Sequence, residues 1–119
     1  DASLIAKARE ELESVYVHED LLGYAASICE ATRRDKSVVL GASPRAMIAL
    51  LRVARAKAAV EGRDYVLPDD IKYASIPVLA HRLVFQNSFY RRGDLGSELI
   101  ARIIETTPVP SESIDFSRR

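Results

Sequence analysis

The sequence predicts an all-α fold, a compact bundle of about five helices with a minor two-stranded β patch. Apolar residues recur at the three- and four-residue spacing of helices along several stretches of the chain. Residues that start helices stand before or at the opening of these stretches, among them Ser43, Pro68 and Asp94. The chain has 119 residues and is 48% apolar. That length and composition suit one domain with a buried hydrophobic core.

The first helix is predicted over residues 2–14, because apolar positions repeat at helical spacing while glutamates occupy the other face. The β-forming residues 15–17 break this period and indicate a short extended piece. A second helix is predicted over 20–33, with acidic residues in its favoured first turn. Its apolar stripe consists of Leu21, Tyr24, Ala25, Ile28, Cys29 and Thr32.

The third and longest helix is predicted over residues 44–61, and Gly62 is placed as its C-terminal stop. This helix is rich in alanine, which favours close packing against other helices on more than one side. We therefore expect it to be the central helix of the bundle. Its stripe consists of Met47, Leu50, Leu51, Ala54 and Ala58.

After the central helix, residues 65–67 are expected to be extended and to pair with 15–17 as the two-stranded β patch. Pro68 opens a fourth helix, because proline fits the first helical position. Pro77 is expected to end or kink this helix near Ser75, since proline lacks the N–H that a helix interior needs.

The last helix is predicted over residues 95–106, with Asp94 as its cap. It follows a polar, arginine-bearing loop at 86–93, for which the sequence indicates no role. Prolines stop the helix, and the polar residues after it predict disorder. The expected organisation is a helical domain, 1–107, and a polar, disordered tail, 108–119.

Charge and cysteine content narrow the class of protein. The formal net charge is zero, with 17 basic and 17 acidic residues, whereas a general nucleic-acid-binding protein normally has a basic excess. No run approaches 18 apolar residues, so we expect no membrane partner. The single cysteine excludes an internal disulfide and is compatible with a reducing compartment. A cytoplasmic location is therefore expected.

One motif, Gly41-Ala42-Ser43-Pro44-Arg45-Ala46, predicts a loop that turns into a helix. Ser43 can cap the first free N–H groups, and Pro44 fits the first helical position. Arg45 then lies in the first turn, where the helix dipole slightly disfavours a cation. Two interpretations remain open on local chemistry. Arg45 is a solvent-facing helix residue, or it meets an anion that something outside this chain supplies.

The sequence contains no self-sufficient active site. It lacks the phosphate-binding patterns GxxxxGK[ST] and GxGxxG, and the metal patterns HExxH and CxxC, so no metal site is predicted. Cys29 is interpreted as a small core residue, and His81 as a structural histidine that bonds to backbone. Asp69 and Asp70 are neighbours that point about 100° apart on a helix, so they are interpreted as complementing the helix dipole. These features indicate an all-α module that acts with something else.

Several motifs together resemble one family. They are Tyr24 with Ala31-Thr32-Arg33, the Gly41-Ala42-Ser43-Pro44-Arg45-Ala46 motif, the segment from Gly62 to Ile71, and His81-Arg82-Leu83. Their order and spacing resemble the C-terminal lid domain of MoxR-type AAA+ ATPases over about residues 5–107. One position departs from the family pattern: Leu67 stands where a small hydroxyl or acidic residue is common, which weakens the cap of the fourth helix.

The resemblance implies that Arg45 is the sensor 2 residue, directed at the γ-phosphate of ATP, with Ser43 and Pro44 beside it in the nucleotide-contacting loop. It implies ATP and Mg²⁺ held mainly by an N-terminal α/β core, neighbouring subunits in a ring, taken as a hexamer, and a client protein that is remodelled or matured in a chaperone-like manner. The chain alone is not expected to hydrolyse ATP. The client, the ring size and any nucleotide binding by the isolated chain stay open.

Two other functions fit parts of the sequence. One is a helical nucleic-acid-binding module, whose contact surface would consist of Arg45, Arg52, Arg55, Lys57 and Arg63. Zero net charge and few aromatic residues argue against it. The other is a passive protein-interaction adaptor with no link to nucleotide.

Overall fold

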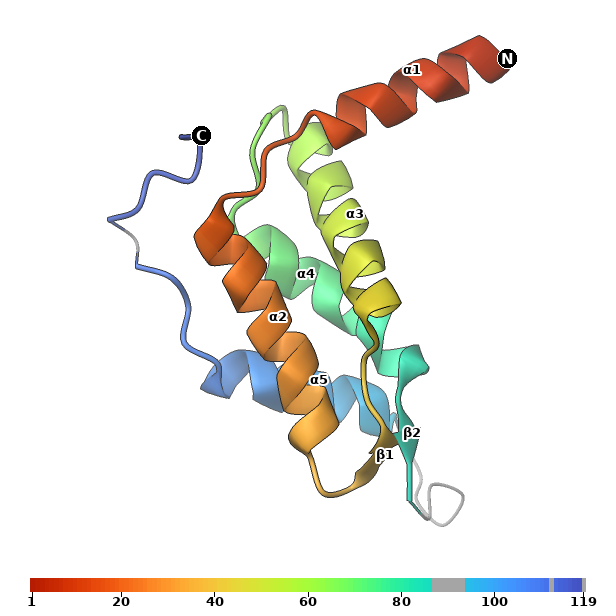
Figure 1. The fold of residues 1–119 in the computed structure, drawn as a ribbon, viewed down its shortest axis with the longest axis vertical. Helices are drawn as coiled ribbons and strands as arrows, with labels where there is room; N and C mark the ends of the chain where they lie inside the picture. The colour runs from red at the N-terminus through yellow and green to blue at the C-terminus, as the bar shows by residue number, and fades with distance from the viewer. Residues whose placement is uncertain (87–93, 112, 119) are drawn as a thin grey trace.

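The computed structural model describes residues 1–86, 94–111 and 113–118. Most of the predicted loop 86–93 therefore lies outside the described residues. The elements are α1 (Ala2–Glu13), α2 (Glu19–Arg34), β1 (Val38–Leu40), α3 (Pro44–Val60), α4 (Pro68–Leu79), a 3₁₀ helix (Ala80–Arg82), β2 (Val84–Phe85) and α5 (Leu95–Thr106). Helices α2 to α5 form a bundle, and α1 projects away from it (Figure 1). The predicted all-α class is confirmed.

The core forms where the predicted stripes meet. All six predicted stripe residues of α2 are buried. Helix α3 packs against α1, α2 and α4, whereas α2 and α4 each pack against three helices of the bundle, so the expectation that α3 is the central helix is not confirmed. Of its predicted stripe, Met47 is only partly buried, and the buried residues of α3 are Ala46, Leu50, Leu51, Ala54 and Ala58. The alanine content correctly predicted that α3 packs against other helices on more than one side.

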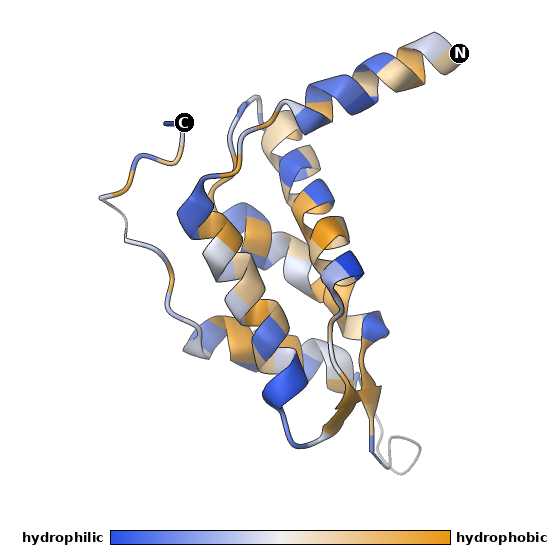
Figure 2. Cartoon of the chain, viewed as in Figure 1, coloured by the Kyte–Doolittle hydropathy of each residue, from blue (hydrophilic) through white to orange (hydrophobic). Residues whose placement is uncertain are grey.

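Helix α1 has the predicted position and almost the predicted length, but none of its residues is buried. Leu4 is 68% exposed and Ile5 is 55% exposed. Figure 2 shows apolar and polar residues mixed along this projecting helix. A helix of 12 residues is marginally stable alone in water. The apolar periodicity therefore predicted the helix correctly. Most of the apolar face of α1 is nevertheless not covered by other described residues.

The small β structure differs from the prediction in its location. Residues 15–17 and 65–67 do meet, but only through a single parallel bridge between Tyr16 and Tyr65. The Val66 N–H donates to the Tyr16 carbonyl at 2.8 Å. The two-stranded sheet is formed instead by β1 and β2, which run antiparallel and are strongly apolar (Figure 2). Both strands are recognisable as short apolar runs, whereas their pairing is set by the packing of the helices around them.

Helix α4 continues through Pro77 to Leu79, so Pro77 does not end it near Ser75, and the alternative of a kink there stays a prediction. Pro77 has no N–H to donate to the carbonyl of Tyr73. Both residues are exposed, Tyr73 by 61%, so the helix faces water on this side. The loss is therefore small at this position near the end of the helix.

The disorder expected for residues 108–119 stays a prediction. Within this stretch the structure gives Phe116 an exposure of only 7%. The Phe116 ring meets the His18 ring edge to face, with ring centres 5.8 Å apart. Ile114 is partly buried against the same core. Through these two apolar side chains, the otherwise polar C-terminal segment lies beside the start of α2.

Candidate functional site

Arg45 lies in the first turn of α3, where the sequence placed it. Ser43 is the N-cap of this helix, and its hydroxyl accepts the Ala46 N–H at 3.2 Å. Pro44 occupies the first helical position, so both predicted helix-starting roles are confirmed. The Arg45 side chain is exposed. Among the described residues it has no hydrogen-bond or ion-pair partner, so its charge is available to an external anion.

Arg45 shares one face of α3 with Ile48 and Arg52, because these residues are three and seven positions apart. Ile48 is 54% exposed. It also lines, with Arg52, a groove of about 670 Å³ between α1 and α3. We call these three residues the α3 face. An exposed isoleucine between two arginines suits contact with a protein surface that also presents an anion.

The cations proposed for nucleic-acid binding do not act as one free surface. Arg55 donates from Nε to the Val15 carbonyl at 3.1 Å and is partly buried. Lys57 and Arg63 are both engaged with a buried carboxylate, Asp70. Phosphate binding depends on cations that are free to replace counterions. Of the contact surface proposed for nucleic acid, only Arg45 and Arg52 therefore remain. The structure gives this alternative function little support.

The loop before Arg45 is held by the last turn of α2. The Ala42 N–H donates to Thr32 Oγ1 at 2.8 Å, and Arg33 Nη1 donates to the Ala42 carbonyl at 2.5 Å. Gly41 lies so close to α2 that a Cβ on it would be 2.7 Å from the Arg33 Cα. Thr32 and Arg33 belong to a motif that carried the family resemblance, but sequence reasoning assigned them no role at this site.

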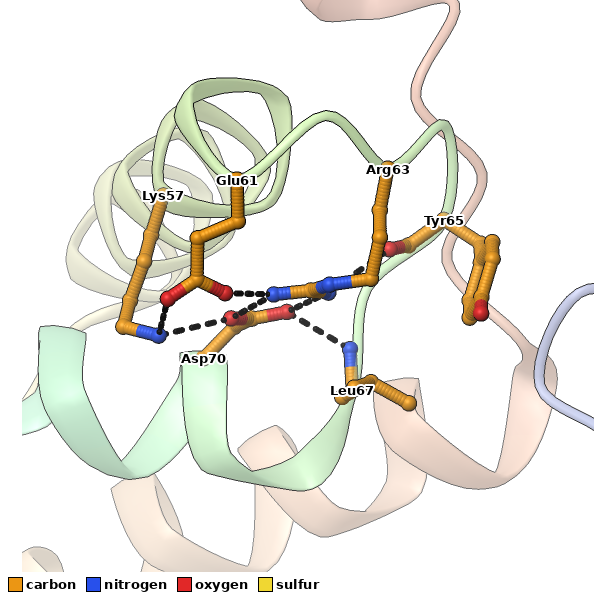
Figure 3. Close-up of polar contacts among 6 residues, drawn as sticks. All are labelled: Lys57, Glu61, Arg63, Tyr65, Leu67 and Asp70. Carbon is orange, nitrogen blue, oxygen red and sulfur yellow. Dashed lines mark hydrogen bonds and ion pairs between the residues drawn. The ribbon is translucent and has the colours of Figure 1, made fainter.

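A second polar cluster joins the end of α3 to the start of α4 (Figure 3). Asp70 is fully buried. Its carboxylate receives Arg63 Nη1 and Nη2 at 2.6 and 2.9 Å, Lys57 Nζ at 3.2 Å and the Leu67 N–H at 2.7 Å. Glu61, at the surface, also pairs with both cations. The cluster thus ties three segments to one buried negative charge.

The dipole interpretation of the acidic pair is incomplete for Asp70, which lies in the first turn of α4 but also pairs with Arg63 and Lys57. Asp69 is exposed in the first turn of α4, whereas Asp70 turns inward to Arg63. Leu67, the N-cap residue, has no side chain that can accept a hydrogen bond, as the family departure predicted. The Asp70 carboxylate makes the reciprocal contact by accepting the Leu67 N–H. Half of a capping box therefore remains, and it is part of the buried cluster.

Burial alone would raise the pKa of Asp70, but hydrogen bonds from Arg63, the Leu67 N–H and Lys57 outweigh it and lower the pKa below 3.8. The hydrogen bonds that Arg63 donates to Asp70 and Glu61 raise the pKa of Arg63 in turn. Asp70 is therefore ionised throughout the neutral range, and its charge is compensated on several sides.

This lowered pKa predicts a loss of stability in acid. Because the folded-state pKa of Asp70 lies below the usual value of 3.8, its contribution is fully present above that value. The contribution falls as the pH drops through 3.8 toward the folded-state pKa. We expect the carboxyl carbon of Asp70, followed by NMR, to titrate below 3.8. We also expect the stability difference between the native chain and Asp70→Asn, from urea unfolding, to shrink over the same range. A midpoint above 3.8 would contradict the compensation seen in the cluster.

Three other titratable side chains, Cys29, His18 and His81, lie outside this cluster. Cys29 is buried, and burial raises the pKa of its thiol, which fits a core residue. His18 caps α2 by accepting the Asp20 N–H on Nδ1 at 3.0 Å. His81 is exposed and has no hydrogen bond to backbone among the described residues, so that interpretation of His81 is wrong.

The described part of the chain has neither a metal-binding group of side chains nor a helix that could cross a membrane. In residues 1–86, 94–111 and 113–118, no group of three or more His, Cys, Asp or Glu side chains is arranged to hold a metal ion. None of the helices described there combines the length and apolar character that crossing a membrane requires. The cytoplasmic location stays a prediction.

Known proteins resemble this chain over most of its length. Residues 30–103 match the AAA lid domain family. Chaperone MoxR1 of Mycobacterium tuberculosis is 31% identical over 115 residues, which cover 89% of this chain and 30% of that protein. Protein MoxR of Methylorubrum extorquens is 44% identical over 78 residues, covering 64% of this chain and 22% of that protein.

A solved structure shows the same fold. The crystal structure of a putative ATPase from Cytophaga hutchinsonii matches with a TM-score of 0.80 and 31% identity, over 88% of this chain and 34% of that one. The chain thus spans about a third or less of the length of these relatives. The family match covers the loop, Arg45 and the Asp70 cluster alike. The chain belongs to the AAA lid domain family, and it is a lid of the MoxR-family AAA+ ATPase type.

Proposed function

We propose that this chain is the lid that closes over ATP bound by an α/β ATPase core, and that Arg45 is its sensor 2 arginine, in contact with the γ-phosphate. One observation carries the proposal. Arg45 is a cation placed against the dipole of α3, exposed and without a partner among the described residues. A guanidinium keeps its charge at all relevant pH values and offers directional donors that match phosphate oxygens.

Ser43 and Pro44 contribute to this site by setting where the helix begins. The Ser43 hydroxyl is already bound to the Ala46 N–H, and Pro44 has no N–H to offer. The two residues therefore hold Arg45 at a fixed position in the first turn. The described residues present this guanidinium but no cluster of acidic ligands, so Mg²⁺ and the other phosphates are assigned to the core.

Arg45 would have two effects in the closed state. It would stabilise negative charge on the transferred phosphoryl group, as arginine contacts do in phosphoryl transfer. It would also link the angle of the lid to the state of the nucleotide, because loss of the γ-phosphate removes its partner. ATP hydrolysis would thereby be coupled to movement of the lid.

The α3 face and the exposed apolar side of α1 are proposed to rest on the core and on neighbouring subunits of a ring, taken as a hexamer. Leu4, Ile5 and Ile48 are all more than half exposed, so contact with the core would cover apolar surface that the described residues leave in water. One relative is named a chaperone, which supports chaperone-like remodelling of a client protein as the output. We place this activity in the cytoplasm.

The isolated chain is expected to bind Mg-ATP weakly and not to hydrolyse it. One charge-assisted hydrogen-bonding group contributes about 1.5–3 kcal/mol, whereas micromolar affinity requires about 8 kcal/mol. Backbone amide NMR during a titration with Mg-ATP measures this directly, and only small shifts near Arg45 are expected. A low-micromolar site formed by the chain alone would contradict the division of labour between lid and core.

A further inference from the structure

Two neighbouring residues at the end of α2 hold both polar groups of Ala42. Thr32 Oγ1 accepts the Ala42 N–H, and Arg33 Nη1 donates to the Ala42 carbonyl. Ala42 is fully buried and directly precedes the N-cap residue Ser43. The backbone is therefore fixed from the side just before α3 begins, three residues ahead of Arg45.

The Thr32 hydroxyl is held in one orientation. It is fully buried, and it donates its own hydrogen to the Cys29 carbonyl at 2.6 Å. A lone pair is thereby left to face the Ala42 N–H, so the contact does not depend on a freely rotating group. Both partners are out of water, where an unmade hydrogen bond is costly.

The close approach of Gly41 completes the contact. A Cβ at this position would lie 2.7 Å from both Cα and Cγ of Arg33. The loop thus lies directly against the backbone of α2 and the first part of the Arg33 side chain. Its position relative to α2 is set by backbone contact as well as by the two hydrogen bonds.

We infer that Thr32 and Arg33 are positioning residues, which fix the start of α3 and thereby the direction of Arg45. The inference rests on the proposed sensor 2 function. Pro44 has a fixed φ and Ser43 caps the helix, so little freedom remains between Ala42 and Arg45. A displacement of Ala42 would therefore carry Arg45 with it. Misplacement of a catalytic group by about 1 Å can cost about a hundredfold in rate.

The test uses the complete ATPase that carries this lid. Thr32→Val removes the hydroxyl but keeps the shape, and Arg33→Met removes the donor but keeps an apolar stem. Each is expected to lower kcat about 10- to 100-fold with a smaller change in KM for ATP. Thr32→Ser should restore most of kcat because it restores the hydroxyl.

Matched controls repeat the same chemical changes away from α3. Thr106→Val removes an exposed hydroxyl that donates to the Arg102 carbonyl at the end of α5. Arg34→Met removes the arginine next to Arg33, which pairs with Glu30 at the surface. Both variants should keep kcat close to that of the native ATPase.

A double-mutant cycle with Arg45→Ala separates positioning from mere support of the fold. If Thr32 and Arg33 act through Arg45, their variants lower kcat when Arg45 is present and add little when it is absent. Circular dichroism melts establish that each variant is folded. Arg33 is exposed, so Arg33→Met can decide the matter even if Thr32→Val does not fold.

Different results would overturn the positioning role of Thr32 and Arg33 and the proposed sensor 2 function of Arg45. The inference is overturned if Arg45→Ala lowers kcat but Thr32→Val and Arg33→Met leave it unchanged. It is also overturned if they lower kcat by the same factor with and without Arg45. If folded Arg45→Ala hydrolyses ATP normally, the proposed sensor 2 function fails, and the positioning role fails with it.

Discussion

Arg45→Ala is expected to lower ATP turnover by the complete ATPase about 10²–10³-fold, the usual cost of removing one preorganised donor from a charged transition state. Folding should be spared, because the Arg45 side chain is exposed and has no partner among the described residues. Steady-state hydrolysis with saturating Mg-ATP measures the effect, and thermal melts of the same preparation confirm the fold.

Two further variants define what Arg45 supplies. Arg45→Lys keeps the charge but loses the planar arrangement of donors, so its turnover should fall between that of the native ATPase and that of Arg45→Ala. Arg102→Ala removes an exposed arginine from α5 and should leave turnover unchanged. Normal hydrolysis by a folded Arg45→Ala variant would refute the assigned role.

The second large effect is on stability. Asp70→Ala is expected to lower the free energy of unfolding by about 3–5 kcal/mol, because it leaves Arg63 and Lys57 without their buried counter-charge. It also leaves the Leu67 N–H without its acceptor at the start of α4. Urea unfolding of the chain near neutral pH, where Asp70 is ionised, measures the difference.

Asp69→Ala is the matched control, since it makes the same change one residue earlier in the same turn. Asp69 is exposed and complements only the helix dipole, so its loss should cost about 0.3–1 kcal/mol. Equal and small losses for the two variants would show that the buried cluster contributes little net stability. A chain that does not fold with Asp70→Ala but folds with Asp69→Ala agrees with the prediction.

Sequence patterns predicted those parts of the fold that depend on local chemistry. The stripe of α2 and the helix-starting roles of Ser43 and Pro44 follow from periodicity and backbone sterics. The pairing of β1 with β2 and the contact of Phe116 with His18 join segments far apart in the chain. Neither end of such a contact reveals its partner, and the sequence did not predict them.

For the candidate site, too, the sequence predicted some features and missed others. Local chemistry could not decide whether Arg45 faces solvent or binds an anion. The family resemblance indicated that the anion is a nucleotide. The hydrogen bonds that join Ala42 to Thr32 and Arg33 were not foreseen, because these residues lie ten and nine positions before Ala42, across a strand. The inward turn of Asp70 was missed because Arg63 lies across a loop from it. Tertiary packing decides both contacts, and no single helical or strand period encodes them.

The central claim is that Arg45 contacts the γ-phosphate of ATP. The most direct measurement compares the affinity of the complete ATPase for ADP and for a non-hydrolysable ATP analogue, with and without the Arg45→Ala substitution. We predict that the substitution weakens binding of the triphosphate analogue about 10- to 100-fold, the value of one charge-assisted contact, and leaves ADP affinity unchanged. Unchanged affinity for the analogue, or equal losses for both nucleotides, would contradict it.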